Sequence, residues 1–312
     1  MSAEPVIVTE GLAFPEGPVA MADGSVIVVE IKTGKLTRVA PDGTKSEVAD
    51  VGGGPNGLAI GADGAMYVCN NGGFVWTELG DLNIPLGAGG VSQHEGYVTG
   101  SLQRVDLATG AVTTLYTECD GNRLNGPNDI VVDQDGGIWF TDLGKTRERD
   151  VDRGFIYWAN ADGSEIRQVA AGHTGYNGIG LSPDGSRLYS VETSTARLYA
   201  WDIAGPGELT GANPLTGGGI YLGSGHPNSA FDSLAVEAGG NICVATLAHE
   251  PGITVFSPDG AIVEQVPMPD LLPTNICFSG DDMQTAHVTL SATGKLARAE
   301  WSRPGLKLNF NQ

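Results

Sequence analysis

A short motif recurs six times along the 312-residue chain, and its second residue is nearly always a side chain that can offer an oxygen ligand. The copies align without a gap and end in a turn rich in Asp and Gly, as in PEGPVAMADG, PNGLAIGADG and PNDIVVDQDG. The residues at the second position are Glu16, Asn56, Asn128, Asn177, Asp232 and Thr274. Two acids and three carboxamides at one repeat position form an oxygen donor set, which indicates a site for a hard cation.

The donor set also limits which cation fits. Calcium takes roughly six to eight oxygen ligands at ~2.3–2.6 Å, whereas zinc prefers His and Cys. We therefore expect Glu16, Asn128, Asn177 and Asp232 to bind one divalent metal ion, calcium first, with zinc, manganese or magnesium as alternatives. Asn56 would lie nearby. A competing interpretation is that Asn and Asp here only hydrogen-bond the entering turn, which does not account for Glu16.

Each copy of the motif is followed by further short apolar runs joined by tight turns. In the first unit, Asp23-Gly24, Thr33-Gly34 and Asp42-Gly43 separate the runs PVAM, SVIVVE, KLTRVA and KSEVADV. Such runs predict antiparallel strands, four to a unit. The motif recurs at intervals of roughly 40 to 70 residues, which is the order of period that propellers have. The charged stretch 145–153 is expected to loop out between strands of the third unit.

These patterns predict an all-β fold, a six-bladed β-propeller with four-stranded antiparallel blades, formed by residues 1–312 as a single domain. The blades should begin near residues 11, 52, 119, 173, 226 and 269. The last blade lacks an outermost strand, which the N-terminal strand 5–9 would supply, so that the ring closes without an open edge. The first strand of each blade lies nearest the axis, so the second motif positions would meet at one mouth of the central channel.

Composition limits the partners of the chain. It has 17 basic and 37 acidic residues, a formal net charge of -20, which opposes binding to nucleic acid or an anionic membrane. No secretory signal pattern and no apolar run near ~18 residues is present. The four cysteines lack the CxxC spacing of zinc and redox sites, which favours reduced structural thiols. We expect a cytoplasmic protein with neither nucleic acid nor membrane as a partner, while its oligomeric state stays open.

Four blocks of sequence resemble a known family. FPEGPVA, GPNDIVVDQDGGIWFTD, YNGIGLSPDGSRLYSVE and PTNICFSGDDMQTAHVT are similar to blocks of the family that includes gluconolactonase, senescence marker protein (regucalcin) and luciferin-regenerating enzyme. The resemblance covers nearly the whole chain. It implies a six-bladed propeller with a divalent metal at its axis, and commonly lactone hydrolysis. Carried over by position, it implies the metal ligands Glu16, Asn128, Asn177 and Asp232.

The resemblance also implies catalytic roles. Asp232 matches the position to which such enzymes assign general-base or nucleophilic work, with Ser233 beside it. We therefore expect Asp232 to accept a proton from the attacking water, although a carboxylate bound to calcium has a low proton affinity. Asp129 and Asp142 are the alternative candidates for the general base. The competing interpretation is that each of them lies in a turn or contacts a metal ligand.

A second group of residues is expected to contact the substrate. Asn56 and Asp129 flank the predicted ligands, and Arg123 matches an arginine that binds sugar hydroxyls in some members of the family. An insertion from residue 72 to residue 96 interrupts the second unit and contains Trp76, with Tyr97 just after it. These aromatic residues would form an apolar wall of the pocket, or would only pack the insertion against its own blade.

The sequence therefore predicts a metal-dependent hydrolase of the carboxylic-ester class that opens a small-molecule lactone. One alternative is a calcium-dependent phosphotriesterase or arylesterase, which needs no different ligand set. An alternative of another class is a propeller that binds calcium or a protein without catalysis.

Overall fold

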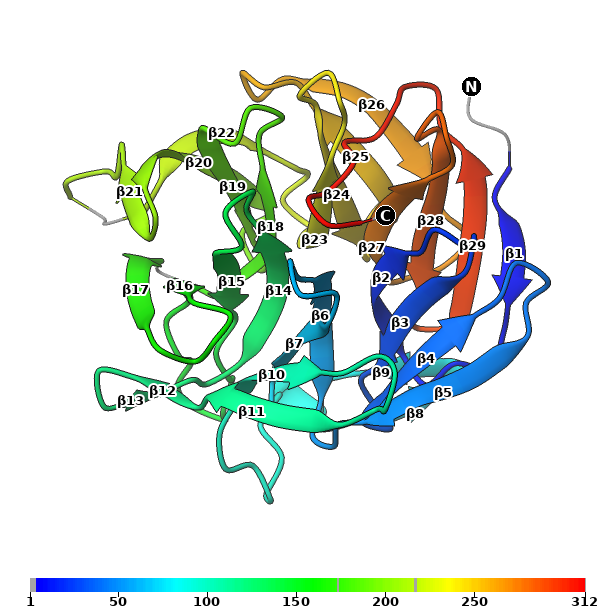
Figure 1. The fold of residues 1–312 in the computed structure, drawn as a ribbon, viewed down its shortest axis with the longest axis horizontal. Coiled ribbons are helices and arrows are strands. Elements are labelled where there is room, and N and C mark those ends of the chain that lie inside the picture. The colour runs from blue at the N-terminus through cyan, green and yellow to red at the C-terminus, as the bar shows by residue number, and fades with distance from the viewer. Residues whose placement is uncertain (1–3, 173, 216–217, 312) are drawn as a thin grey trace.

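The computed structural model describes residues 4–172, 174–215 and 218–311. These residues form an all-β six-bladed β-propeller with mostly four-stranded antiparallel sheets, which confirms the predicted fold class (Figure 1). The predicted start of the fourth blade, residue 173, lies outside the described residues. No helix in the described ranges is long and apolar enough to cross a lipid bilayer.

The blades follow one another along the chain, and each blade starts with its innermost strand. The first blade contains β2 (Pro15–Ala20), β3 (Val26–Glu30), β4 (Lys35–Val39) and β5 (Lys45–Asp50). The second contains β6 (Pro55–Ile60), β7 (Met66–Asn70), β10 (Ser101–Val105) and β11 (Val112–Tyr116). The third contains β14 (Pro127–Val132), β15 (Ile138–Asp142), β16 (Phe155–Ala159) and β17 (Ile166–Ala171).

The fourth blade differs from the predicted four strands. It contains β18 (Tyr176–Leu181), β19 (Arg187–Glu192), β20 (Arg197–Gly205), β21 (Glu208–Thr210) and β22 (Ile220–Ser224). Both β21 and β22 pair with β20. The reason is the length of β20, because its two halves each have room for one short outer partner.

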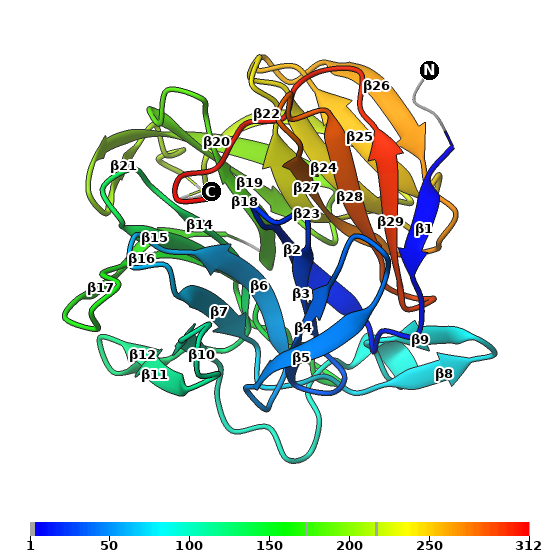
Figure 2. The same ribbon diagram turned by 45° about the vertical axis from the view of Figure 1, so that its right-hand side comes forward.

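The last two blades complete the ring. The fifth contains β23 (Ala230–Val236), β24 (Ile242–Leu247), β25 (Gly252–Phe256) and β26 (Ile262–Pro267). The sixth contains β27 (Pro273–Ser279), β28 (Thr285–Leu290), β29 (Lys295–Glu300) and β1 (Val6–Thr9). The N-terminal β1 pairs antiparallel with β29, so both ends of the chain contribute to this blade (Figure 2).

Apolar clusters fill the space between neighbouring blades. One cluster joins blades two and three and includes the rings of Phe140 and Tyr157 of blade three, which stack at 5.2 Å. Another joins blades three and four and includes the rings of Tyr176 and Trp201 of blade four, which meet edge-on at 5.6 Å. All four cysteines are buried and have free thiols. This packing between the faces of the sheets holds the six inner strands in place around the channel.

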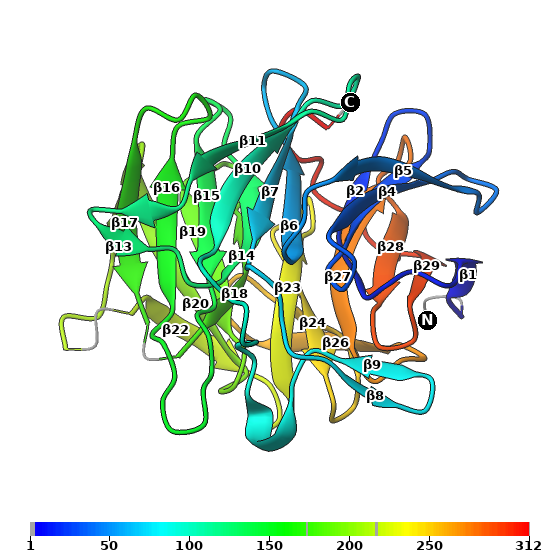
Figure 3. The same cartoon turned by 90° about the horizontal axis from the view of Figure 1, so that it is seen from below.

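The insertion after β7 lies on one face of the propeller. It contains the hairpin of β8 (Thr77–Leu79) and β9 (Leu82–Ile84), followed by the short 3-10 helix η1 (Ala88–Gly90). A second small hairpin, β12 (Glu118–Cys119) with β13 (Asn122–Arg123), precedes the third blade. Figure 3 shows the β8–β9 hairpin and the C-terminus on opposite faces of the ring.

His287, on β28, is a buried histidine that should make stability depend on pH. Burial and the nearby charge of Arg298 lower its pKa from 6.5 to about 4. The folded state therefore binds this proton more weakly than the unfolded state, so the contribution is present above pH 6.5 and is lost as the pH falls toward 4. Replacing His287 by Gln should remove about 2 kcal/mol of the stability loss between pH 7 and pH 4.5, measured by urea unfolding. Equal losses in the two proteins would contradict this account.

Candidate metal centre

The second motif position lies at the start of the innermost strand in each blade, next to an irregularity in strand pairing. The register shifts between Glu16 and Val19 in β2, between Pro127 and Ile130 in β14, and at the corresponding place in the other four blades. A bulge of this kind turns side chains away from the regular alternation of a strand. The repeated bulge gives the second position the same setting in all six blades.

The third motif position sets how closely neighbouring blades approach. A Cβ atom placed on Gly57 would lie 2.4 Å from the backbone oxygen of Asn128, and one on Gly178 would lie 2.7 Å from that of Asp232. Real Cβ atoms do not approach other atoms this closely, so only glycine fits. Each glycine therefore admits the backbone of the second-position residue in the next blade.

The four predicted metal ligands differ in their exposure. Glu16, Asn128 and Asn177 are each at most 3% exposed, whereas Asp232 is half-buried. Asp232 is close enough to Glu16 for the two carboxyl groups to influence each other, and it accepts a hydrogen bond from the side chain of Asn177. Of the four, Asp232 is the one that solvent or a bound molecule can reach most easily.

Two of these residues present oxygen atoms that have no partner. Within the described residues, neither Asn128 Oδ1 nor Asn177 Oδ1 accepts a hydrogen bond, although both atoms are buried. The amide nitrogen of Asn177 donates to Thr193 Oγ1 at 3.1 Å, which directs the oxygen to the other side. A buried acceptor without a partner costs about 1–3 kcal/mol. Two such acceptors beside carboxylates are what an oxygen-coordinated cation would satisfy.

Glu16 is held in place by its neighbours. Asn275 Nδ2 donates to Glu16 Oε2 at 2.8 Å, Ser233 Oγ donates to Glu16 Oε1 at 3.3 Å, and the amide of Gly17 also donates to Glu16. Burial nevertheless raises its pKa to about 7, and these hydrogen bonds oppose that shift. The carboxyl group is oriented before any ligand arrives, yet its charged form lacks sufficient solvation.

Asp129 and Asp232 have raised pKa values for related reasons. Burial is the main cause in both, and the charge of Glu16 is the second. The pKa of Asp129 rises to about 8, although its oxygens accept from the amides of Ile130 at 2.9 Å and Ile179 at 3.1 Å. Three carboxyl groups therefore share a poorly solvated region, where a divalent cation would stabilise the charged forms.

The donor set is mixed rather than purely acidic. Across residues 4–172, 174–215 and 218–311, no three His, Cys, Asp or Glu side chains form a group that could hold a metal. The candidate site instead combines the carboxylates of Glu16 and Asp232 with the amide oxygens of Asn128 and Asn177. Because every donor is an oxygen, these residues fit a hard divalent cation such as calcium. Their assignment as ligands stays a prediction.

Asn56 and Arg123, two of the residues predicted to bind the substrate, differ in their exposure. Asn56 is buried on β6, and its backbone oxygen lies against Gly17. Arg123 is exposed on β13 and donates to the carbonyl of Val98 at 3.3 Å. Neither residue has a hydrogen bond to the four predicted ligands within the described part of the chain. Their roles in binding a substrate stay predictions.

Trp76 and Tyr97, the two aromatic residues predicted to contact the substrate, both contact other groups of the protein. The ring of Trp76 lies 5.2 Å from that of Phe14, which precedes the first motif. The hydroxyl of Tyr97 donates to the carbonyl of Asn125 at 2.6 Å. Both contacts fix the insertion to the neighbouring blades one and three, whereas the packing interpretation expected contacts with its own blade. A role of these rings as pocket walls is untested.

From the sequence, Ser233 was named only as the neighbour of Asp232, and Asn275 was not identified. Both residues occupy the third motif position, where three other copies have Gly, and both donate to Glu16. The sequence does contain a signal for them, because each is a polar residue at the third motif position, where glycine allows close packing in other blades. Asp142 accepts from the amides of Asn125, Gly126 and Gly144, so it holds a turn, as the competing interpretation expected.

Lys145 was expected in a solvated loop, but it is 1% exposed. Its ammonium donates to the carbonyl of Gly73 at 2.8 Å and lies 4.3 Å from the ring centroid of Phe74 and 5.1 Å from that of Tyr97. Burial lowers its pKa to about 7. The insertion folds over this lysine, and the aromatic faces partly replace the lost water.

The close contact at Gly178 can be tested directly. Gly178→Ala should separate blades four and five, because the new methyl group would overlap the backbone of residues 232–234. We expect a loss of about 1–3 kcal/mol in the free energy of unfolding and weaker calcium binding, measured by denaturant unfolding and isothermal titration calorimetry. Gly239→Ala is the matched control, since a Cβ atom there has nothing within 4 Å. Unchanged calcium affinity in Gly178→Ala would show that this contact does not position the site.

Comparison with known proteins finds relatives of similar sequence. A gluconolactonase of Zymomonas mobilis is 22% identical over 310 residues, covering 91% of this chain and 78% of that protein. The diisopropyl-fluorophosphatase of Loligo vulgaris is 28% identical over 297 residues, covering 91% of this chain and 82% of that protein.

A solved structure supports the fold. Regucalcin of Agrobacterium tumefaciens, described as a calcium-binding protein, superposes with a TM-score of 0.71 at 20% identity and covers 98% of both chains. The region described as SMP-30/Gluconolactonase/LRE-like matches residues 14–292. Because that match extends over most of the sequence, this protein belongs to the SMP-30/gluconolactonase/LRE-like family.

Proposed function

We propose that this protein is a calcium-dependent lactonase, a hydrolase that opens a cyclic ester at the mouth of the propeller channel. The main support is the pair of unpartnered, buried amide oxygens of Asn128 and Asn177 beside the carboxyl groups of Glu16 and Asp232. The relatives include a gluconolactonase and lactonases named drp35, which supports the substrate class. A cytoplasmic location remains a prediction from composition.

Bound by Glu16, Asn128, Asn177 and Asp232, the cation would polarise the carbonyl group of the lactone and offset the negative charge that builds on its oxygen. The protein itself would orient the reacting groups. Asn275 and Ser233 fix the carboxyl group of Glu16, so that this ligand need not reorganise during the reaction.

Asp232 is the proposed general base. It is half-buried, so water can approach it from the mouth, whereas Asp129 is buried and uses both oxygens to accept backbone amides. The raised pKa of Asp232 favours proton acceptance, and an adjacent cation acts in the opposite direction by stabilising the carboxylate. For base catalysis, one oxygen of Asp232 must therefore stay free of the metal.

Phosphotriester hydrolysis is the second candidate activity. A specific observation favours it, since the relative from Loligo vulgaris is a diisopropyl-fluorophosphatase and covers 91% of this chain. The same oxygen ligands could serve a phosphoryl oxygen as well as a carbonyl oxygen. The predicted metal site therefore does not discriminate between the two substrates.

The role of Asp232 can be tested by substitution. Asp232→Asn should lower kcat by about 100-fold or more, because the amide cannot accept the proton from water. Calcium binding, followed by calorimetry, should persist, because an amide oxygen can replace a carboxylate oxygen as a ligand. Asp135→Asn is the control, since Asp135 lies on an exposed turn at the far end of β14. Activity retained by Asp232→Asn would remove the general-base assignment.

The substrate class needs a separate measurement. Chelated protein should hydrolyse aldonolactones and aromatic lactones only after calcium is restored, whereas diisopropyl fluorophosphate should be a poorer substrate. A preference for the organophosphate would favour the second candidate. No hydrolysis of any of these compounds with calcium, zinc, manganese or magnesium would favour a propeller that binds without catalysis.

A further inference from the structure

The other end of the central channel contains a cavity that the proposed reaction does not use. Its volume is about 650 Å³, within the usual range for small-molecule sites. The later residues of the inner strands form its walls, including Ile130, Leu181, Leu234 and Ile276. The cavity therefore opens on the face opposite the insertion, and its deep end reaches Gly17, Asp129 and Asn275, next to the predicted metal ligands at the strand starts.

A C-terminal strap, residues 305–311, crosses this end of the channel. Its first residues are bonded to blades six and five, because Gly305 N donates to the carbonyl of Met283 and Leu306 N to that of Val236, both at 2.8 Å. Further along, Asn309 Nδ2 donates to the carbonyl of Val132, in blade three, at 3.1 Å. Figure 1 shows the C-terminus near the centre of the ring. The strap thus spans this mouth of the channel. Hydrogen bonds hold it to blades five and six at one end and to blade three at the other.

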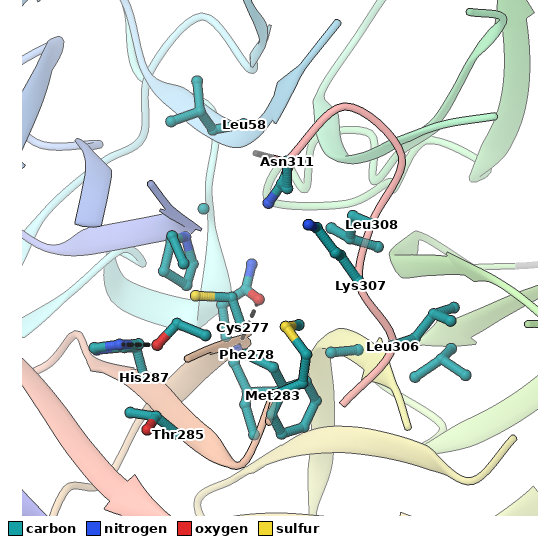
Figure 4. Close-up of a pocket in the computed structure, with 18 of the residues that line it drawn as sticks. Leu58, Cys277, Phe278, Met283, Thr285, His287, Leu306, Lys307, Leu308 and Asn311 are labelled. Atoms are coloured by element: carbon teal, nitrogen blue, oxygen red, sulfur yellow. Dashed lines mark hydrogen bonds between the residues drawn. The ribbon is translucent and has the colours of Figure 1, made fainter. Parts of the chain in front are cut away.

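The strap contributes polar groups to the cavity. Leu306, Lys307, Leu308 and Asn311 all line it. Figure 4 shows the side-chain nitrogens of Lys307 and Asn311 directed from the strap toward the middle of the cavity, while Phe278 and Met283 lie on another wall. Within the described residues, Lys307 forms no ion pair. An unpaired lysine is notable in a chain with 37 acidic residues.

A second set of polar groups lies across the cavity. His287 is 6% exposed, its Nε2 interacts with Ser279 Oγ at 2.9 Å, and its Nδ1 has no partner within the described residues. Arg298, which is paired with His287 across β28 and β29, also lines the cavity and forms no ion pair with the residues that the structure describes. These groups add hydrogen-bonding capacity and positive charge to the second wall.

Two acidic residues also line the cavity, but neither opposes an anion strongly. Asp281 is exposed on the rim, where water and salt screen its charge. Asp129 lies at the deep end, where its two oxygens accept hydrogen bonds from the backbone amides of Ile130 and Ile179. The charged groups on the strap and on the wall opposite it are Lys307 and Arg298, and both are positive.

We propose that the cavity under the C-terminal strap binds a small apolar carboxylate, with its carboxylate group at Lys307 and Asn311 and its apolar body against the inner strands. A carboxylate fits better than a phosphate, because the single ammonium group on the strap balances one negative charge, whereas a phosphate group carries up to two. The apolar walls favour a hydrocarbon body. This inference does not rest on the proposed hydrolase activity, since Lys307 and Asn311 lie at the opposite mouth of the channel from the predicted metal ligands.

The test uses octanoate as the ligand for the full-length protein, with isothermal titration calorimetry in the presence and absence of calcium. Octanoate should bind with one site per chain under both conditions, and 1-octanol and octylammonium should bind at least about tenfold more weakly. Absence of saturable octanoate binding, or equal binding of the three compounds, would overturn the proposal.

Two substitutions locate the site. Lys307→Met should weaken octanoate binding by about tenfold or more through the loss of a charged hydrogen bond, and Lys45→Met, on the outer strand of blade one, is the matched control. Ala235→Phe should abolish binding by filling the cavity, with far-UV circular dichroism as the check on folding. Lys307 is exposed, so its variant should fold even if Ala235→Phe does not. Octanoate binding that Lys307→Met leaves unchanged would place the ligand elsewhere and overturn the proposal.

Discussion

The close approach of inner strands around the axis is the constraint on which the rest of the structure depends. Gly17, Gly57 and Gly178 each face the backbone of the next blade at a distance that a Cβ atom could not occupy. The absence of these three side chains keeps the ring narrow at the level of the second motif position. A narrow ring brings acids and amides from distant parts of the sequence to one mouth and removes most of their contact with water.

The loss of water around Glu16, Asp129 and Asp232 destabilises their charged carboxylate forms. The same loss makes these residues suited to bind a cation. Burial raises the pKa of Glu16, Asp129 and Asp232, and repulsion from Glu16 adds to the effect at the two aspartates. Hydrogen bonds from Ser233 and Asn275 orient Glu16 without removing the cost of its charge. A bound cation would stabilise the carboxylates and the unpartnered amide oxygens together, so binding free energy would also be folding free energy.

The repeat was enough to predict the ring and the positions that face its mouth, because the type of side chain at each motif position can be compared directly across the six copies. The burial of Lys145 could not be found in this way, since it depends on Phe74 and Tyr97 folding back from an insertion that no other blade has. The split edge of blade four arises from the length of β20. The cavity under the C-terminal strap could not be predicted either, because residues 305–311 lie outside the repeats.

The order of residues around the ring has a physical reason of its own. The two acidic ligands predicted for the metal, Glu16 and Asp232, come from blades one and five, and blade six between them presents Thr274. The hydroxyl of Thr274 is buried and bonds to Thr289 at 2.9 Å, and it also hydrogen-bonds Glu16. An acid at this position would add a third charge directly between two others in a poorly solvated region. A hydroxyl separates the two carboxylates and supports one of them, which leaves both able to face a single ion from neighbouring sides.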